Sequence, residues 1–133
     1  AEETADGRAV LLTQRDVREL QLASGAIRAG IGILLRRAGL GPADLDLVFL
    51  GGGFGNFIRR NNAQRIGLLP AEIEHHRIRY QGNTSLAGAR LVALSSRARA
   101  RADELARRTE HVDLSSDLRF HQAFAEAMLF PED

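Results

Sequence analysis

A run of apolar residues that ends in three glycines constrains the fold of this chain more than any other feature. The apolar residues are Leu47, Val48, Phe49 and Leu50, and the glycines are Gly51, Gly52 and Gly53. Such a run predicts a strand of a parallel sheet that is buried on both faces. Ligands bind beyond the carboxyl ends of such strands, where glycine lets a phosphate or a sugar approach the backbone closely. We name Gly51–Gly53 the glycine bend. With Phe54 and Asn56 beside it, the bend is a candidate nucleotide site.

Helical and strand patterns alternate along the rest of the chain. The longest predicted helix has about 25 residues, begins after Thr13 in a capping box with Asp16, and ends at Gly39. Its predicted buried stripe is Val17, Leu20, Ser24, Ile27, Ile31, Leu34, Leu35 and Ala38. Short strands are predicted at 9–12, 78–80 and 111–114. Further helices are predicted from residue 56 or 60 to 68, from Thr84 or Ser85 onward, and from Ser115 or Ser116 to Met128, the last with Leu118 inward.

This order of elements predicts an α/β structure in which helices cover a sheet. With 133 residues, the chain has the length of one domain with a real core. Residues 1–8 show no periodicity, and we expect them to be a disordered lead-in to a domain at 9–133.

Four residues of the long helix lie along one line beside its apolar stripe: Gln21, Gly25, Arg28 and Gly32. Each glycine inside a helix costs about 1 kcal/mol relative to alanine, so a close approach should explain the two glycines. Either another helix packs tightly there, or Gln21 and Arg28 face a bound nucleotide. The sequence alone leaves both interpretations open.

Composition excludes several kinds of chemistry within these residues. All 18 basic residues are arginine, which removes a catalytic or phosphate-binding lysine, and there is no cysteine for a disulfide, a thiolate metal site or an iron–sulfur cluster. His75 and His76 are adjacent and diverge on any regular element, so we expect no metal site and no catalytic residue. The net charge of +1 gives no case for nucleic acid or a membrane surface. Without an apolar span or a signal-peptide pattern, the expected location is cytoplasmic.

The glycine bend also differs from the two commonest nucleotide motifs. It lacks the lysine of a P-loop, and Asn56 stands where a dinucleotide fingerprint has its third small residue. The next predicted strand ends at Tyr80 and Gln81, without the acidic residue that binds a ribose. We therefore expect a backbone surface that can hold a nucleotide but has no group to react it.

Several motifs together resemble a known family. They are Leu12–Ala23, Gly25–Ile31, Phe49–Ile58, Arg65–Pro70, Gly82–Ala89 and Phe130–Pro131. In this order they resemble the C-terminal domain of the reductive activators of corrinoid proteins, over nearly the whole chain from about residue 10. The resemblance implies a fragment of an actin-like, ribonuclease H-like ATPase lobe of the sugar-kinase and heat-shock-chaperone type, with a mixed sheet covered by long helices.

The resemblance also implies roles for particular residues. Gly51, Gly52, Gly53 and Phe54 would form the adenosine motif of the actin-like fold, and Gly82–Ala89 would be its second connecting helix. The helix with Gln21 and Arg28 would line the adenine or ribose side. Ser24 stands where the family often has lysine, so a basic contact from that position is in doubt. The family's aspartate–glycine phosphate loops and its ferredoxin cysteines have no counterpart here.

The implied function is the adenosine side of an ATP site in a reductive activator. Such a protein would use ATP to support electron transfer from its N-terminal 2Fe–2S ferredoxin domain to a cob(II)alamin-bearing methyltransferase partner. We expect the chain to act with the remainder of a longer polypeptide, and to bind ATP weakly or not at all and without catalysis when isolated. The alternatives are a segment of a small-molecule kinase of the same superfold and a non-catalytic interaction module.

Overall fold

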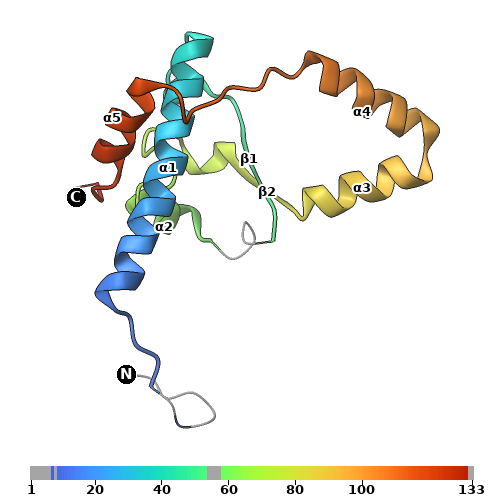
Figure 1. Cartoon of the computed structure of the whole chain (residues 1–133). Coiled ribbons are helices and arrows are strands. Elements are labelled where there is room, and N and C mark those ends of the chain that lie inside the picture. Colours follow the sequence, from blue (N-terminus) through green and yellow to red (C-terminus); the bar gives the residue numbers. More distant parts are fainter. Residues whose placement is uncertain (1–6, 8, 54–57, 132–133) are drawn as a thin grey trace.

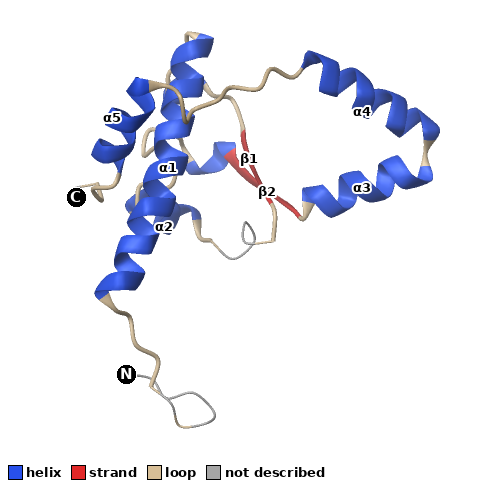
Figure 2. Cartoon of the chain, viewed as in Figure 1, coloured by secondary structure: helices blue, strands red, loops and turns tan. Residues whose placement is uncertain are grey.

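The computed structural model describes residues 7, 9–53 and 58–131. Within them lie five α-helices: α1 (Gln14–Ala38), α2 (Arg60–Arg65), α3 (Thr84–Leu94), α4 (Ser96–Arg108) and α5 (Leu118–Ala127). The two strands are β1 (Val48–Gly51) and β2 (Ile78–Gly82), and short 3-10 turns, η1 (Pro42–Asp44) and η2 (His75–Arg77), precede them. The predicted α/β class is confirmed (Figures 1 and 2). Of the expected lead-in at 1–8, only Gly7 is described; residues 1–6 and Arg8 lie outside the described residues.

Local signals place both ends of α1 where the sequence predicts them. The Thr13 N–H donates to Asp16 Oδ2 at 2.7 Å, and the Asp16 N–H donates to Thr13 Oγ1 at 3.3 Å, which completes the capping box. At the other end Gly39 has φ 71°, and its N–H donates to backbone carbonyls of the last turn.

The buried face of α1 differs from the predicted stripe. Leu20, Ile27 and Leu34 are each more than two-fifths exposed. Of the predicted stripe only Ser24 is among the buried residues of the helix, and the others that are buried are Gly25, Ala29, Gly30 and Ile33. Helix α5 lies along this small-residue face (Figure 1), and a Cβ on Gly25 would lie 3.1 Å from the Met128 nitrogen. Tight helix packing, one of the two interpretations, therefore accounts for Gly25.

The strands β1 and β2 form a parallel pair. Val48 pairs with Ile78, Phe49 with Arg79 and Leu50 with Tyr80, before the register shifts at Gly51. One face of this pair rests on a core cluster formed by Ala63, Leu69, Ile73 and Ile78.

Burial on both faces of β1 is contradicted. Val48 and Leu50 pack on the core, but Phe49, which points the other way, is 59% exposed because no described element covers that face. In the described residues the sheet is a two-stranded parallel pair and not the mixed sheet that was expected (Figure 2).

Two predicted strands do not form. Residues 9–12 contain only an isolated bridge at Ala9, and 111–114 is irregular. The alternation in 111–114 has a different cause: Leu114 packs against α1, with its Cδ1 3.3 Å from the position of a Cβ on Gly30. Asp113 accepts hydrogen bonds from the backbone N–H and hydroxyl of Ser115 in a tight turn.

The long helix predicted from Thr84 or Ser85 is interrupted. It ends at Leu94, and Ser95 caps a second helix, α4, by accepting from the Ala98 N–H. The caps of α3 and α5 are Asn83 and Asp117 in place of the predicted serines or threonine. None of the residues in α3 or α4 is buried. These two consecutive helices, which we call the hairpin, stand apart from α1 and α5 (Figure 1). Leu118, predicted to face inward, is 85% exposed.

Candidate functional site

The glycine bend begins at the carboxyl end of β1, as predicted, and its first two glycines are required by the fold. A Cβ on Gly51 would lie 2.5 Å from Thr84 Oγ1, which real Cβ atoms do not tolerate. Gly52 has φ 113°, a conformation that favours glycine, and its N–H donates to the Gly82 carbonyl at 2.8 Å.

Gly53 differs from the two glycines before it. Its φ lies outside the range that favours glycine, and a Cβ there would meet no described atom within 4 Å. Packing within the described residues therefore gives no reason for a glycine at this position. A ligand that approaches the backbone closely would give one.

Both strands end beside the bend because they run parallel (Figure 2). Helix α3 starts directly after β2, and Asn83 Oδ1 accepts from the Leu86 N–H at 3.0 Å in its first turn. The site is thus formed by two strand ends and one helix start, an arrangement that favours an anionic ligand. The predicted site residues Phe54 and Asn56 lie outside the described residues.

Sequence reasoning missed two residues near the bend, Tyr80 and Arg60. The Tyr80 hydroxyl donates to the Ile58 carbonyl, and the Arg60 guanidinium carbon lies 4.9 Å from the centre of the Tyr80 ring. Tyr80 is the single tyrosine of the chain and pairs with Leu50, directly before the bend. That strand register is the signal that could have found it.

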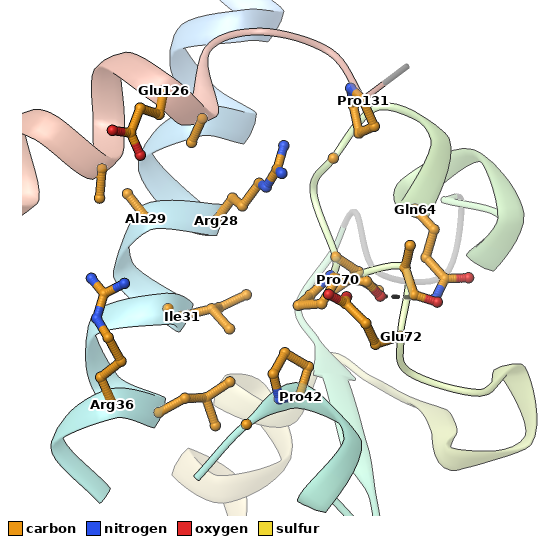
Figure 3. Close-up of a pocket in the computed structure, with 18 of the residues that line it drawn as sticks. Arg28, Ala29, Ile31, Arg36, Pro42, Gln64, Pro70, Glu72, Glu126 and Pro131 are labelled. Atoms are coloured by element: carbon orange, nitrogen blue, oxygen red, sulfur yellow. Dashed lines mark hydrogen bonds between the residues drawn. The ribbon is translucent and has the colours of Figure 1, made fainter. Parts of the chain in front are cut away.

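Arg28 lines a cavity of about 470 Å³ between α1, α5 and the segment 64–72 (Figure 3). It extends from α1 toward the 64–72 side, and its Nη1 lies 3.1 Å from the position of a Cβ on Gly67. The charged lining residues are Arg28, Arg36, Glu72 and Glu126. Two arginines and two glutamates balance, so the cavity has no strong preference for an anion.

The structure does not bring all the predicted site residues into one cavity. Neither the glycine bend nor Gln21 lines the cavity that holds Arg28. Gln21 is half-buried in α1, and its backbone carbonyl accepts from Ser24 Oγ at 3.4 Å. Gly32, on the same helical line, does border the cavity.

The carboxylates with lowered pKa values are explained by caps and turns. Hydrogen bonds from the Thr13 hydroxyl and N–H lower the pKa of Asp16, and hydrogen bonds from Ser115 lower the pKa of Asp113. The Arg119 side chain and N–H lower the pKa of Asp117 in the same way. In the described ranges, no three His, Cys, Asp or Glu residues are grouped to hold a metal ion. No helix there is long and apolar enough to cross a membrane.

Comparisons with known proteins agree on one family. The family described as the C-terminal domain of RACo, the ASKHA domain, matches residues 1–133. The corrinoid activation enzyme RamQ of Eubacterium limosum is 36% identical over 133 residues, which are 100% of this chain and 22% of that protein. The [Co(II) methylated amine-specific corrinoid protein] reductase of Methanosarcina barkeri is 35% identical over 88 residues, 66% of this chain and 16% of that protein.

The chain thus spans about a fifth of the length of the first of these relatives. The resemblance seen in the sequence motifs is confirmed, because the family match extends over every residue that carries them. This chain belongs to the family of the C-terminal ASKHA domain of RACo.

Proposed function

We propose that this chain provides the adenosine side of an ATP site in a longer protein that activates a corrinoid protein by reduction. The observation that carries the proposal is Gly53, a glycine that packing among the described residues does not require, just beyond the carboxyl end of a parallel strand. Membership of the ASKHA family supports ATP as the nucleotide. The names of the two relatives, a corrinoid activation enzyme and a corrinoid protein reductase, support a corrinoid protein as the partner.

The residues of the bend suit nucleotide binding better than nucleotide chemistry. The backbone at Gly52 and Gly53 is accessible to a ligand, and the helix start at Asn83 and Thr84 lies beside it. Acidic residues for a metal ion are not grouped in the described part of the chain. In this proposal the isolated chain binds ATP weakly and does not hydrolyse it.

The second wall of the ATP site would come from the remainder of the polypeptide, which would complete an actin-like ATPase domain. The relatives are several times longer than this chain, which supports such a remainder. Uncovered apolar side chains support it too: Phe49 of β1 and Leu86, Leu91 and Leu94 of α3 are all more than half exposed.

The redox centre would also lie in the remainder. The chain has no cysteine, so it cannot hold a 2Fe–2S cluster in the usual way. In the proposed reaction one electron from that cluster reduces cob(II)alamin on a methyltransferase partner to cob(I)alamin, and ATP binding or hydrolysis drives this uphill transfer. A cytoplasmic location stays a prediction.

A replacement at Gly53 tests the proposal better than one at Gly52. Valine at Gly52 would be strained at φ 113° whatever the ligand, so a loss of activity would be ambiguous. The Gly53→Val variant places its Cβ where no described atom lies within 4 Å, so no described residue opposes it, whereas a ligand at the backbone would. Gly41→Ala is the matched control, since its Cβ would make an ordinary contact with Asp44 at 3.5 Å before β1.

The assay uses the full-length protein, a chemical one-electron reductant and the corrinoid partner, and follows cob(I)alamin by absorbance with and without ATP. We expect ATP to be required by the wild type and by Gly41→Ala, and Gly53→Val to be at least about tenfold slower at limiting ATP. Full ATP-dependent activity of a folded Gly53→Val protein would refute the role of the bend.

A further inference from the structure

One strand, β2, holds the chain on both sides of the glycine bend. We propose that Tyr80 of this strand, with Arg60 stacked on it, is the positioning residue that fixes the bend for the nucleotide. This inference rests on the proposed function, and it adds a residue that neither the sequence motifs nor the comparisons assign.

The first attachment lies at the start of the bend. The Gly52 N–H donates to the Gly82 carbonyl at 2.8 Å. The parallel register shifts here: Leu50 pairs with Tyr80 but Gly51 pairs with Gly82, so Gln81 is an extra residue in β2. Just beyond this irregularity the Thr84 side chain lies against Gly51, so close that it would have to shift to admit a methyl group there. The strand thereby sets where β1 ends and the bend begins.

The second attachment lies where the described chain resumes at Ile58. The Tyr80 hydroxyl donates to the Ile58 carbonyl, and the Ile58 side chain packs against the core cluster under the sheet. A backbone carbonyl in such a half-buried position needs a donor, and a side chain of another element supplies it. Tyr80 thus fixes the backbone at Ile58, where the described chain resumes.

The Arg60 guanidinium stacks over the Tyr80 ring. Its guanidinium carbon lies 4.9 Å from the ring centre, within cation–π range. Its Nε atom is buried and has no hydrogen-bond partner among the described residues. Stacking on the ring, more than hydrogen bonding at Nε, therefore orients this side chain. Arg60 opens α2, so the contact also ties that helix to β2.

The two attachments act on the same short stretch. Gly52 is held by Gly82, and Ile58 is held by Tyr80, two residues earlier on the same strand. Removing the Tyr80 hydroxyl frees one side only, and Ile78, the buried core residue of β2, keeps its place. The bend would then shift or move while the domain stays folded, and a misplaced bend binds a nucleotide less well.

The test is a calorimetric titration of ADP into the full-length protein and its Tyr80→Phe variant, with the melting temperature measured without nucleotide. Tyr80→Phe keeps the ring under Arg60 and removes only the hydroxyl. We expect the dissociation constant for ADP to rise about three- to tenfold, the usual effect of one hydrogen bond. Arg60→Lys keeps a cation over the ring and should weaken binding less than Arg60→Met.

Arg77→Met is the matched control, because Arg77 ends η2, directly before the start of β2 and away from the bend. Its Nη1 donates to the carbonyls of Ala43 and Leu45 at 2.9 and 3.0 Å, in the segment before β1. Arg77→Met also removes side-chain hydrogen bonds to backbone carbonyls, so it should lower the melting temperature. Because it lies away from the bend, it should leave ADP affinity unchanged.

Unchanged ADP affinity in Tyr80→Phe, or an equal loss in Tyr80→Phe and Arg77→Met, would overturn the inference and leave the proposed function standing. A wild-type protein that binds no nucleotide would overturn the proposed function itself, and with it the nucleotide role of Tyr80. Hydrogen exchange at the Gly52 amide needs no ligand, so it tests the positioning of the bend by Tyr80 separately from nucleotide binding. Faster exchange in Tyr80→Phe supports the positioning of the bend, and unchanged exchange refutes it.

Discussion

The two helix pairs of this chain show how differently similar apolar patterns can be used. Helix α1 packs against α5 through small residues, with Gly25, Ala29 and Gly30 buried. Helices α3 and α4 meet at Ser95 and diverge from there (Figure 1), and neither has a buried residue. The two pairs differ in what lies beside them. Helix α1 lies between α5 and the core, whereas α3 and α4 extend away from both α5 and the core (Figure 1). A helical pattern predicts the helix, but the partner decides which face is covered.

The uncovered face of the hairpin is apolar. Leu86, Leu91 and Leu94 are 66%, 61% and 76% exposed. Exposed apolar residues gathered on one helix are typical of an interaction surface. Under our proposal the remainder of the polypeptide covers them, so the contrast between the helix pairs should shrink in the full-length protein.

The largest predicted effect is a difference in the free energy of unfolding between a replacement in the core and one in the hairpin. Ile78 is 0% exposed, so Ile78→Ala should lower the free energy of unfolding by about 2–5 kcal/mol in urea titrations. Leu91→Ala should cost less than about 1 kcal/mol in the 133-residue chain. In the full-length protein, Leu91→Ala should approach the cost of a core replacement. Equal, small costs of Leu91→Ala in both proteins would show that nothing covers the hairpin.

A second comparison uses two glycines of α1. A Cβ on Gly25 would lie 3.1 Å from the Met128 nitrogen and 3.2 Å from the Ala127 carbonyl, and backbone atoms cannot easily move away. Gly25→Ala should therefore cost about 1–3 kcal/mol. Gly32→Ala meets nothing within 4 Å and should gain up to about 1 kcal/mol from helix propensity. Thermal unfolding measures both, and a stabilising Gly25→Ala would contradict the packing of α5 on α1.

A third comparison concerns the start of the glycine bend. Gly51→Ala clashes with the Thr84 side chain, a neighbour that can adjust more easily than backbone, so we expect a loss near 1 kcal/mol. Adding Thr84→Ala should recover part of this loss, because the closest atom, Oγ1, is removed. A double-mutant cycle measures the coupling. Additive effects would mean that Gly51 and Thr84 do not meet.

The smallest effect is a pH dependence at the start of α1. Hydrogen bonds from Thr13 lower the pKa of Asp16, so the stabilisation by its carboxylate is present above the usual Asp pKa of about 4. It is lost as the pH falls through the lowered value, when the carboxylate takes up a proton. NMR of the Thr13 amide should follow this titration. In Asp16→Asn the transition at that amide should disappear, and its persistence would assign it to another group.

Local signals in the sequence were sufficient for the two ends of α1, but not for the caps of α3 and α5. Thr13, Asp16 and Gly39 lie within a few residues of the groups that they cap, so the bounds of α1 could be predicted. The interruption at Ser95 has a local signal as well, a serine that caps α4, but the same residue type also occurs within helices.

Contacts between distant residues could not be predicted in this way. The burial of Gly25 depends on Ala127 and Met128 at the other end of the chain. The exposure of Phe49 depends on which elements are present to cover β1.

In the candidate site, too, residues with a local sequence signal were predicted and residues defined by distant contacts were not. The glycines of the bend were found because glycine itself is the signal, and Gly51 and Gly52 have the close contact and the positive φ that call for it. Tyr80 and Arg60 were missed because their contacts depend on strand register. Helical spacing grouped Arg28 with Gln21, and the family resemblance implied that both line the nucleotide site, but Arg28 lines a cavity that includes neither Gln21 nor the bend.

The most direct test of the account is nucleotide binding by the full-length protein and its Gly53→Val variant. We predict that calorimetry detects ATP and ADP binding to the wild type. Gly53→Val should weaken that binding at least about tenfold with an unchanged melting temperature, because its Cβ meets no described atom within 4 Å but would obstruct a ligand at the backbone. Equal affinity in the two folded proteins would contradict a nucleotide site at the glycine bend.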